Sequence, residues 1–555
     1  MKGVKKVKKR IAQFVALVGL SMLFARTAGA SDAAWEAKRE ALKNRARPLI
    51  LNSDGNDMIF YPTNAPITVA AFREQRLNSY RNTRISTLSY CPQSSPFGCM
   101  TSRKAGWLFD SPTGGRGCLN ATSAFIEKLD TDCLEMASDF CRENGLEIFV
   151  SIRVNDTHDS WVKWDPKRPP RLVKFKEENP DCLMGTAQKH PPYGAWTAVD
   201  FENPKVRNSM KKFVSDFVNN YDVDGIEYDF MRHGPIFKSV GWGAYATKAQ
   251  LKLMTDFMVE LRAITEAAGR KKGKPILVLV RTADSLGYAK GIGIDVEAWL
   301  KAGVMDIWSV SDYFQLDYLK PNADLAHRYG VKFYSALAES RVKGSVARLQ
   351  KKGVDARMLP GRNTIASFAA EYAAAQAAGC DGIESFNLST IWRDVNAPEL
   401  LKIDPRNTKG LDKVYFALVR GSGGYSPETW LKDGGRFYRR PRIDPGWRPF
   451  ELQTGKPFAF KMEIGDDPKA GGRATVKALF TSEKPVIEKL TLNGRGLSLA
   501  SFENGIHTFA LGSSGWVRGE NEFKLTPSTA AESKVVFCDF AVYINYSNNK
   551  KGKTK

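Results

Sequence analysis

Two carboxylates lie inside a stretch that has the composition of a buried strand, VDGIEYDFM at residues 223–231. Glu227 and Asp229 are two residues apart, so their side chains would point to the same side of a β-strand. Burying like charges together raises the pKa of at least one group, and a glycosidase needs one protonated acid beside one charged carboxylate. The spacing therefore indicates hydrolysis of a glycosidic bond. The alternative is a structural ion pair with Arg153, Arg232 or Arg281.

Polar residues also stand where the other predicted strands end. In a barrel of parallel strands these ends meet at one face, where substrate binds. We expect the substrate-binding residues to be Asp54, Arg153, Asn155, Asp156, His158, Arg232, His233, Arg281, Asp312, Tyr313, Asn387 and Trp392. The aromatic residues Trp161, Trp164, Tyr313 and Trp392 are suited to stacking on sugar rings. Asp and Asn are also common turn residues, and Asp54 and Asp57 fit that simpler role best.

Eight short apolar runs predict strands, and amphipathic helical patterns lie between most of them. The runs are PLILNSDG, RISTLSYC, LEIFVSIRVND, VDGIEYDFM, PILVLVRT, MDIWSVSDYF, KFYSALAES and DGIESFN. Predicted helices include residues 122–145, 203–221, 247–269 and 368–379. This alternation predicts an α/β fold, a (β/α)8 TIM barrel with long loops. A doubly wound open sheet is the alternative.

A short repeat favours the closed barrel over the open sheet. DGIE occurs at residues 224–227 and again at 381–384, in the fourth and eighth predicted strands. Opposite strands of a closed barrel would carry such a half-barrel repeat. A chance match of four residues is the other explanation.

The pattern changes beyond residue 410, where alternating strands are broken by Gly, Asn, Pro and Ser. The predicted strands are FAFKMEIG, ATVKALFTS, VIEKLTLNG, HTFALG, NEFKLTP and KVVFCDFAVYI. They predict a C-terminal all-β sandwich. We therefore divide the chain into a barrel at residues 31–410, a wrapped connector at 411–445, a sandwich at 446–546 and a basic disordered tail at 547–555.

The N-terminus has the order of a secretory signal peptide. Residues 1–10 are mostly basic, a largely apolar run of fifteen follows, and AGA at residues 28–30 is a cleavage site. The apolar run is shorter than the ~20 residues of a membrane span. We therefore expect cleavage near Ala30, a secreted or periplasmic protein, and no stable membrane insertion.

Charge limits the classes of partner. The chain carries a net charge of +22, and residues 1–30 contribute seven basic and no acidic residues, leaving +15 for residues 31–555. An exported basic protein can meet anionic polysaccharides. The sequence lacks a basic helix interleaved with aromatic residues, so we do not expect a nucleic-acid partner.

Cysteine and histidine usage argues against a cofactor. Five of the eight cysteines fall between residues 91 and 141, and some of them could pair in an oxidising compartment. Their connectivity stays open. The chain has no CxxC pair and five histidines, so we expect no metal site and no cofactor.

The stretch YDVDGIEYDFMRHG at residues 221–234 resembles the glycosyl-hydrolase-like family related to glycoside hydrolase family 10, which are exported TIM-barrel proteins. LNSDGND, EIFVSIRVNDTHD, GIGIDVEAWLKAGVMD and GCDGIESFN fit the family layout over residues 46–405. Asp224 to Asp229 also resembles the DGIDID strand of family 18 chitinases, but Met231 falls where those enzymes carry their proton-donating Glu. The Asn-Glu dipeptide of family 10 xylanases is absent as well. The sandwich resembles galactose-binding-like modules.

The resemblance implies a carbohydrate substrate and catalytic carboxylates at the ends of strands four and seven. We therefore expect an exported glycoside hydrolase that acts on a poly- or oligosaccharide, with anionic polysaccharides among its candidate substrates. Asp229 would be the proton donor, Glu339 the nucleophile, and Glu227 would tune Asp229. The alternatives are a non-catalytic glycan-binding protein on a TIM-barrel scaffold, and a surface adhesin in which the sandwich carries the function.

Overall fold

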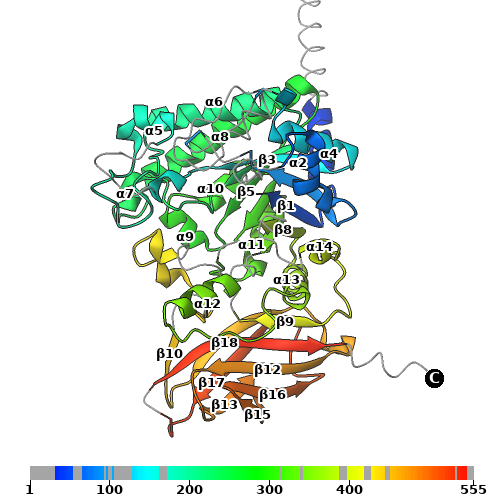
Figure 1. The fold of residues 1–555 in the computed structure, drawn as a ribbon, viewed down its shortest axis with the longest axis vertical. Coiled ribbons are helices and arrows are strands. Elements are labelled where there is room, and N and C mark those ends of the chain that lie inside the picture. Colours follow the sequence, from blue (N-terminus) through cyan, green and yellow to red (C-terminus); the bar gives the residue numbers. More distant parts are fainter. Residues whose placement is uncertain are drawn as a thin grey trace, which may run out of the picture.

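The structure is a computed structural model with a barrel at one end and a sandwich at the other (Figure 1). It describes residues 32–53, 65–92, 96–97, 103–104, 128–161, 172–311, 314–337, 342–386, 397–417, 427–443, 445, 450–531 and 534–546. The predicted signal peptide and the basic tail lie outside these ranges. Across the part of the chain that the structure describes, every helix is too short or too polar to span a lipid bilayer.

Eight parallel strands close into a barrel in chain order, and β1 pairs with β8 to complete the ring. The strands are β1 (Leu49–Ser53), β2 (Ile85–Tyr90), β3 (Glu147–Arg153), β4 (Gly225–Asp229), β5 (Leu277–Thr282), β6 (Ile307–Val310), β7 (Lys332–Leu337) and β8 (Gly382–Phe386). Each one falls inside one of the eight predicted runs. The predicted TIM barrel is confirmed, and the open-sheet alternative is excluded.

Helices cover the outside of this ring. They are α2 (Val69–Arg76), α4 (Cys133–Glu143), α5 (Lys174–Glu178), α6 (Pro204–Asn220), α7 (Lys238–Gly241), α8 (Lys248–Lys272), α9 (Leu286–Gly291), α10 (Val296–Lys301), α11 (Leu319–Arg328), α12 (Val342–Lys351), α13 (Ile365–Ala378) and α14 (Ala397–Leu400). Asn203 caps α6 by accepting from the Lys205 N–H, with Pro204 in the first turn, as the sequence predicts. The helix predicted over residues 122–145 is interrupted: residues 128 and 129 are helical, and Asp132 then caps α4, which begins at Cys133. Residues 122–127 lie outside the described ranges.

The interior of the barrel is divided into two layers. An apolar cluster fills the half nearer the strand N-termini, and it consists of Ile50, Phe149, Leu277, Leu279, Ile307 and Tyr334. Above it, nearer the strand C-termini, the inward-facing residues are polar and buried: Asn52, Ser89, Ser151, Glu227, Arg281, Ser309 and Glu384. The apolar layer is the packed core expected of this fold, whereas the polar layer lies below the face where barrels bind substrate.

The C-terminal domain packs two antiparallel sheets face to face. One sheet contains β9 (Lys413–Phe416), β10 (Phe450–Gln453), β12 (Arg473–Phe480), β15 (Leu499–Glu503), β16 (Ile506–Gly512) and β18 (Lys534–Asn545). The other contains β11 (Phe458–Ile464), β13 (Ile487–Leu492), β14 (Arg495–Leu497) and β17 (Gly519–Pro527). All six predicted strands are present, and the predicted sandwich is confirmed. Strand β9, within the predicted connector, pairs with β18.

Barrel and sandwich share one helix and a buried ion pair. Helix α13 packs against barrel strands β7 and β8 on one side and against β9 and β11 on the other (Figure 1). Its residues Ala370 and Ala373 belong to the apolar core of the sandwich. Arg362 binds Asp539 of β18 through two hydrogen bonds of 2.9 and 2.7 Å. The two domains are therefore held together by packing and by charge.

Residues 427–443 return from the sandwich to the barrel and pack on the loops that follow β4 and β5. Trp430 covers Gly234, where a Cβ atom would collide with the indole ring. Leu431 contacts Gly291, and Phe437 lies against Tyr288 with ring centroids 6.1 Å apart. Because these loops follow strand C-termini, the segment forms part of the wall beside the barrel mouth.

Candidate functional site at the barrel mouth

The guanidinium of Arg281 lies among three carboxylates inside the barrel. Its Nε lies 3.2 Å from Glu227 Oε1, and its Nη2 lies 2.5 Å from Asp229 Oδ2. Its Nη1 lies 3.5 Å from Oε1 of Glu384. All four side chains are buried. The ion pair that the sequence left open as an alternative is therefore present, and it involves Arg281.

Asp229 and Glu227 accept further hydrogen bonds. Oδ1 of Asp229 accepts from the Met231 N–H at 2.8 Å, so both oxygens of this carboxylate face donors. Glu227 accepts from Asn52 Nδ2 at 2.8 Å to each oxygen and from the Ser89 hydroxyl. Burial raises the pKa of Glu227 against the opposing effect of Arg281, and neighbouring Asp229 adds to the rise.

Glu384 is the residue of this group that the sequence analysis did not select. Burial raises its pKa to about 8, the nearby Glu227 adds to the rise, and Arg281 opposes it. At neutral pH its carboxyl group therefore carries a proton, while Asp229 faces a cation and a backbone donor. The signal that pointed to Glu384 was the second DGIE, which was used only as an argument for closure of the barrel.

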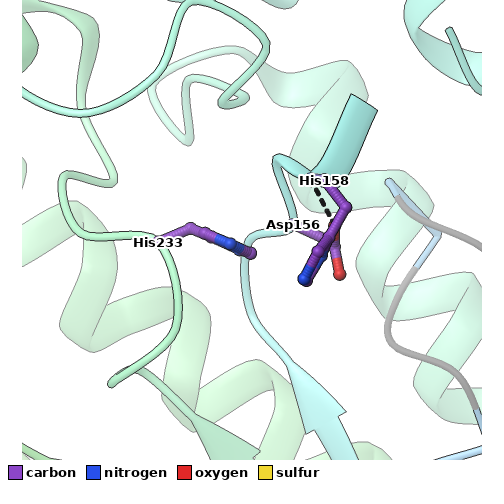
Figure 2. Close-up of side chains that lie close together, drawn as sticks. All are labelled: Asp156, His158 and His233. Atoms are coloured by element: carbon purple, nitrogen blue, oxygen red, sulfur yellow. Dashed lines mark hydrogen bonds and ion pairs between the residues drawn. The ribbon is translucent and has the colours of Figure 1, made fainter. Parts of the chain in front are cut away.

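A second cluster lies on the loops that follow β3 and β4. Figure 2 shows Asp156, His158 and His233 pointing toward one another. His158 Nδ1 lies 2.7 Å from Asp156 Oδ1, and the two imidazole rings meet edge to face with centroids 4.8 Å apart. Arg153 Nη1 donates to Asp156 Oδ2 at 2.9 Å. The structure thus brings together residues that the sequence predicted on two separate strand ends.

Phe386, the last residue of β8, lies between the two clusters. The guanidinium of Arg281 is 4.5 Å from the centroid of its ring, and that of Arg232 is 5.7 Å away. Arg232 Nη2 also lies 3.3 Å from His158 Nε2. The buried carboxylates and the histidine cluster are therefore neighbouring parts of one site at the C-terminal ends of β3, β4 and β8.

Asp156, His158 and His233 have the residue types of a metal site, with potential ligand atoms within 4.8 Å of one another. Two cations compete with a metal ion there, because Arg153 holds one Asp156 oxygen and Arg232 contacts His158. Burial together with these arginines lowers the pKa of His158, although Asp156 opposes the shift. Burial alone would raise the pKa of Asp156. His158 and Arg153 outweigh burial and hold this pKa well below its usual range.

The remaining predicted site residues either have a structural role or lie outside the described ranges. The amide of Asn155 is bonded to the backbone of Val199 in both directions, at 3.2 Å each, so it fixes the loop after β3. Seven predicted residues lie outside the described ranges: Asp54, Asp57, Asp312, Tyr313, Glu339, Asn387 and Trp392. Trp164 lies there as well.

No protein-family model matches the sequence, and no curated protein is similar to it. Several solved structures align with the chain at low identity. A family GH18 chitinase from Chromobacterium violaceum is 11% identical over 90% of both chains, with a TM-score of 0.36. The catalytic domain of the psychrophilic chitinase B from Arthrobacter TAD20 is 12% identical over 66% of this chain and 96% of its own, with a TM-score of 0.38.

A third solved structure is the PgaB (BpsB) glycoside hydrolase domain from Bordetella bronchiseptica. It is 11% identical over 65% of this chain and 98% of its own length, with a TM-score of 0.35. Similarities of this size do not bear on substrate or mechanism. The residues at the barrel mouth are therefore the basis for assigning a function.

Proposed function

We propose that the protein is an exported glycoside hydrolase that acts on a poly- or oligosaccharide at the C-terminal mouth of its barrel. The observation that carries this proposal is the placement of carboxyl groups with different protonation states beside one another. Asp229 accepts from Arg281 and from a backbone N–H, whereas the pKa of Glu384 is raised to about 8 by burial. Glycosidases use such differences in environment to keep one carboxylate charged, and at this site the charged group is Asp229.

The hydrogen bonds of Asp229 favour a role as the charged carboxylate, because an acceptor-only carboxylate is the ionised form. This assignment differs from the proton-donor role that the sequence suggested. Glu339, two residues beyond the end of β7, is then the candidate proton donor. Glu227 and Arg281 would position Asp229. In this arrangement Asp229 serves as nucleophile or as general base, depending on its distance from the acid.

Two variants and a matched control test the proposal. Asp229→Asn and Glu339→Gln should each lower kcat on a cleaved glycan by at least about a thousandfold, since each removes one of the two groups that make and break the bond. The control is Asp224→Asn, five residues earlier at the other end of β4, where the carboxylate accepts from the Ile148 N–H. It should keep kcat. Undiminished turnover by Asp229→Asn would remove Asp229 from the mechanism.

A non-catalytic glycan-binding protein is the second candidate. Its support is that Glu227 and Asp229 are both paired with Arg281, and that buried Met231 follows where a further acid would be expected. Saturable binding of a glycan by the parent protein, with no product after prolonged incubation, would favour this candidate over the enzyme.

Export is part of the proposal and depends on residues 1–30. The chain should be translocated and should begin at Ser31 after cleavage. N-terminal sequencing of the released protein measures this directly. Retention of residues 1–30 in a membrane fraction would contradict it.

A further inference from the structure

His233 has an uncommon backbone conformation and a buried side chain. Its backbone has a φ of 57°, in the left-handed region that few non-glycine residues adopt, and its side chain is buried. Trp430 covers the following residue, Gly234, and so fixes the turn from the other side. Strained, buried polar residues of this kind concentrate at functional sites.

The imidazole of His233 has one nitrogen that is bonded and one that is not. The Thr157 N–H donates to Nδ1 at 3.2 Å, and the Asn155 carbonyl oxygen lies 3.4 Å from the same nitrogen. Because a backbone N–H can only donate, the shorter contact requires Nδ1 to accept and places the proton of the neutral ring on Nε2. Within the described part of the chain, Nε2 is buried and has no hydrogen-bond partner. A buried donor without an acceptor is costly, and it is satisfied if a bound molecule supplies an oxygen atom.

The charged side chains described around this N–H donor are positive on balance. Arg153 and Arg232 carry two positive charges, and Asp156 carries one negative charge. Burial lowers the pKa of His233 well below its usual range, and His158 and the two arginines add to the shift against the effect of Asp156. Both imidazoles are therefore uncharged at neutral pH, and among the described residues Arg153, Arg232 and Asp156 together carry a net charge of +1.

From this geometry we infer that Arg232 and the Nε2–H of His233 form a subsite for an anionic substituent of the glycan, a carboxylate or a sulfate. The guanidinium of Arg232 lies 3.3 Å from His158 Nε2 and 5.7 Å from the centroid of the Phe386 ring, and Arg232 follows the β4 strand that ends in Asp229. Guanidinium groups suit such anions because they donate in pairs to two oxygens. The inference rests on the proposed glycan site, and it adds the substrate class.

A divalent cation is the competing occupant, since Asp156, His158 and His233 include metal-binding residue types. The tautomer set by Thr157 places a proton on the nitrogen that would have to bind the metal. Arg232 occupies the neighbourhood of the second histidine. Both features favour an anion.

The first experiment uses the parent protein and needs no particular glycan backbone. The chain has five histidines, so their imidazole NMR signals can be assigned by substitution. Sodium sulfate and galacturonate are titrated separately against sodium chloride at equal ionic strength. We expect saturable shifts of His158 and His233, and no comparable shift of His190, His327 or His507. The anion that saturates at lower concentration identifies the substituent.

The second experiment compares variants by the same titration. Arg232→Gln and His233→Asn should each weaken anion binding by about tenfold or more, the effect expected for losing a charge-assisted or buried hydrogen bond. Asn tolerates the left-handed backbone of this position. The control Arg357→Gln removes one positive charge from a half-exposed arginine that pairs with Asp355, and it should bind like the parent protein.

Three results would overturn the inference. They are unselective or absent histidine shifts, anion binding that survives Arg232→Gln, and stoichiometric Zn²⁺ binding that His233→Asn abolishes. Failure of the anionic-subsite inference can be distinguished from failure of the proposed hydrolase function. Cleavage of an anionic glycan that is insensitive to Arg232→Gln removes the anionic subsite alone. Selective anion binding by a protein that cleaves no glycan removes the hydrolase alone.

Discussion

The same four residues, Asp-Gly-Ile-Glu, begin two opposite strands of the barrel, β4 and β8. Asp224 accepts from the Ile148 N–H and Asp381 from the Phe333 N–H, each at 2.9 Å, so each Asp joins its strand to the preceding one. Each Glu then points inward toward Arg281. The half-barrel repeat therefore has a common local geometry at both places.

The two glutamates nevertheless have different surroundings. Glu227 lies 3.2 Å from the guanidinium and also accepts from Asn52 and Ser89. Glu384 lies 3.5 Å from the guanidinium, and burial raises its pKa to about 8. Identical local sequence thus places two carboxyl groups alike, and the neighbours on β1, β2 and β5 decide their protonation. The predictions that follow test this difference.

The largest effect is expected for Arg281→Met, which removes the cation from between the two glutamates and Asp229. The variant should lose about 3–5 kcal/mol of unfolding free energy, because it leaves buried carboxylates without their counter-charge. Urea unfolding measures this loss. A change below about 1 kcal/mol would show that the carboxylates do not depend on Arg281.

The stability of the protein should fall as pH rises. Glu384 has an ordinary pKa of 4.5 and a folded pKa of about 8, so the folded protein keeps a proton that the unfolded chain releases. The stabilisation that Glu384 gives the folded protein is complete below about pH 4.5 and is lost as the pH rises through about 8. At about 1.4 kcal/mol per pH unit between pH 4.5 and 8, the loss of unfolding free energy is on the order of 5 kcal/mol.

Urea unfolding at pH 5, 7 and 9 measures this loss, with Glu384→Gln as the comparison. The variant should lose less stability between pH 5 and 9, since it has no proton to release at this position. Asp284 also loses stability as the pH rises, because burial raises its pKa to about 7. Both the parent protein and Glu384→Gln should show this part of the loss. Equal pH profiles for the parent protein and the variant would contradict the protonated state of Glu384.

At pH 7 the two Glu→Gln substitutions should differ. Glu227→Gln should cost about 2 kcal/mol, because it replaces a carboxyl group that accepts from Asn52 and Ser89 with an amide whose N–H groups meet those of Asn52. Glu384→Gln should cost less than about 1 kcal/mol, because a protonated carboxyl is already neutral. Thermal unfolding of both variants checks this, and equal losses would mean that the two environments are equivalent.

The smallest difference is expected between the two glycines of the repeat. A Cβ atom at Gly382 would collide with the backbone oxygen of Arg47, whereas at Gly225 it would meet the ring of Phe149 at 2.6 Å. A ring can rotate away more easily than a backbone can shift. Gly382→Ala should therefore cost about 1 kcal/mol more than Gly225→Ala, within the range of overpacked cores. Unfolding in urea compares them.

Much of the fold was predictable because it depends on short-range patterns. All eight barrel strands and six of the sandwich strands fall in the predicted runs, since their apolar periodicity is local. The start of α4 was missed because Asp132, inside the predicted helix, acts as its cap. Strand β9 was placed in the connector because four residues give too weak a pattern, and its pairing with β18 is remote in sequence.

The candidate site was predictable in position and less so in role. Asp156, His158, Arg232 and His233 were selected because they follow strands, and the fold brings them together. Arg281 was expected to contact substrate, but it lies buried among carboxylates, which no spacing along β5 could reveal. Glu384 was not selected because its strand looks like any apolar strand with one acid.

The sequence by itself determined the order of strands and helices, the face on which each side chain lies, and the strand ends where chemistry can occur. These follow from the periods of two and 3.6 residues and from capping, which act over a few residues. The tertiary structure alone decided which carboxyl keeps its proton and which histidine nitrogen is left without a partner. Those properties depend on burial and on charges from strands far apart in sequence, because electrostatic interactions act through space.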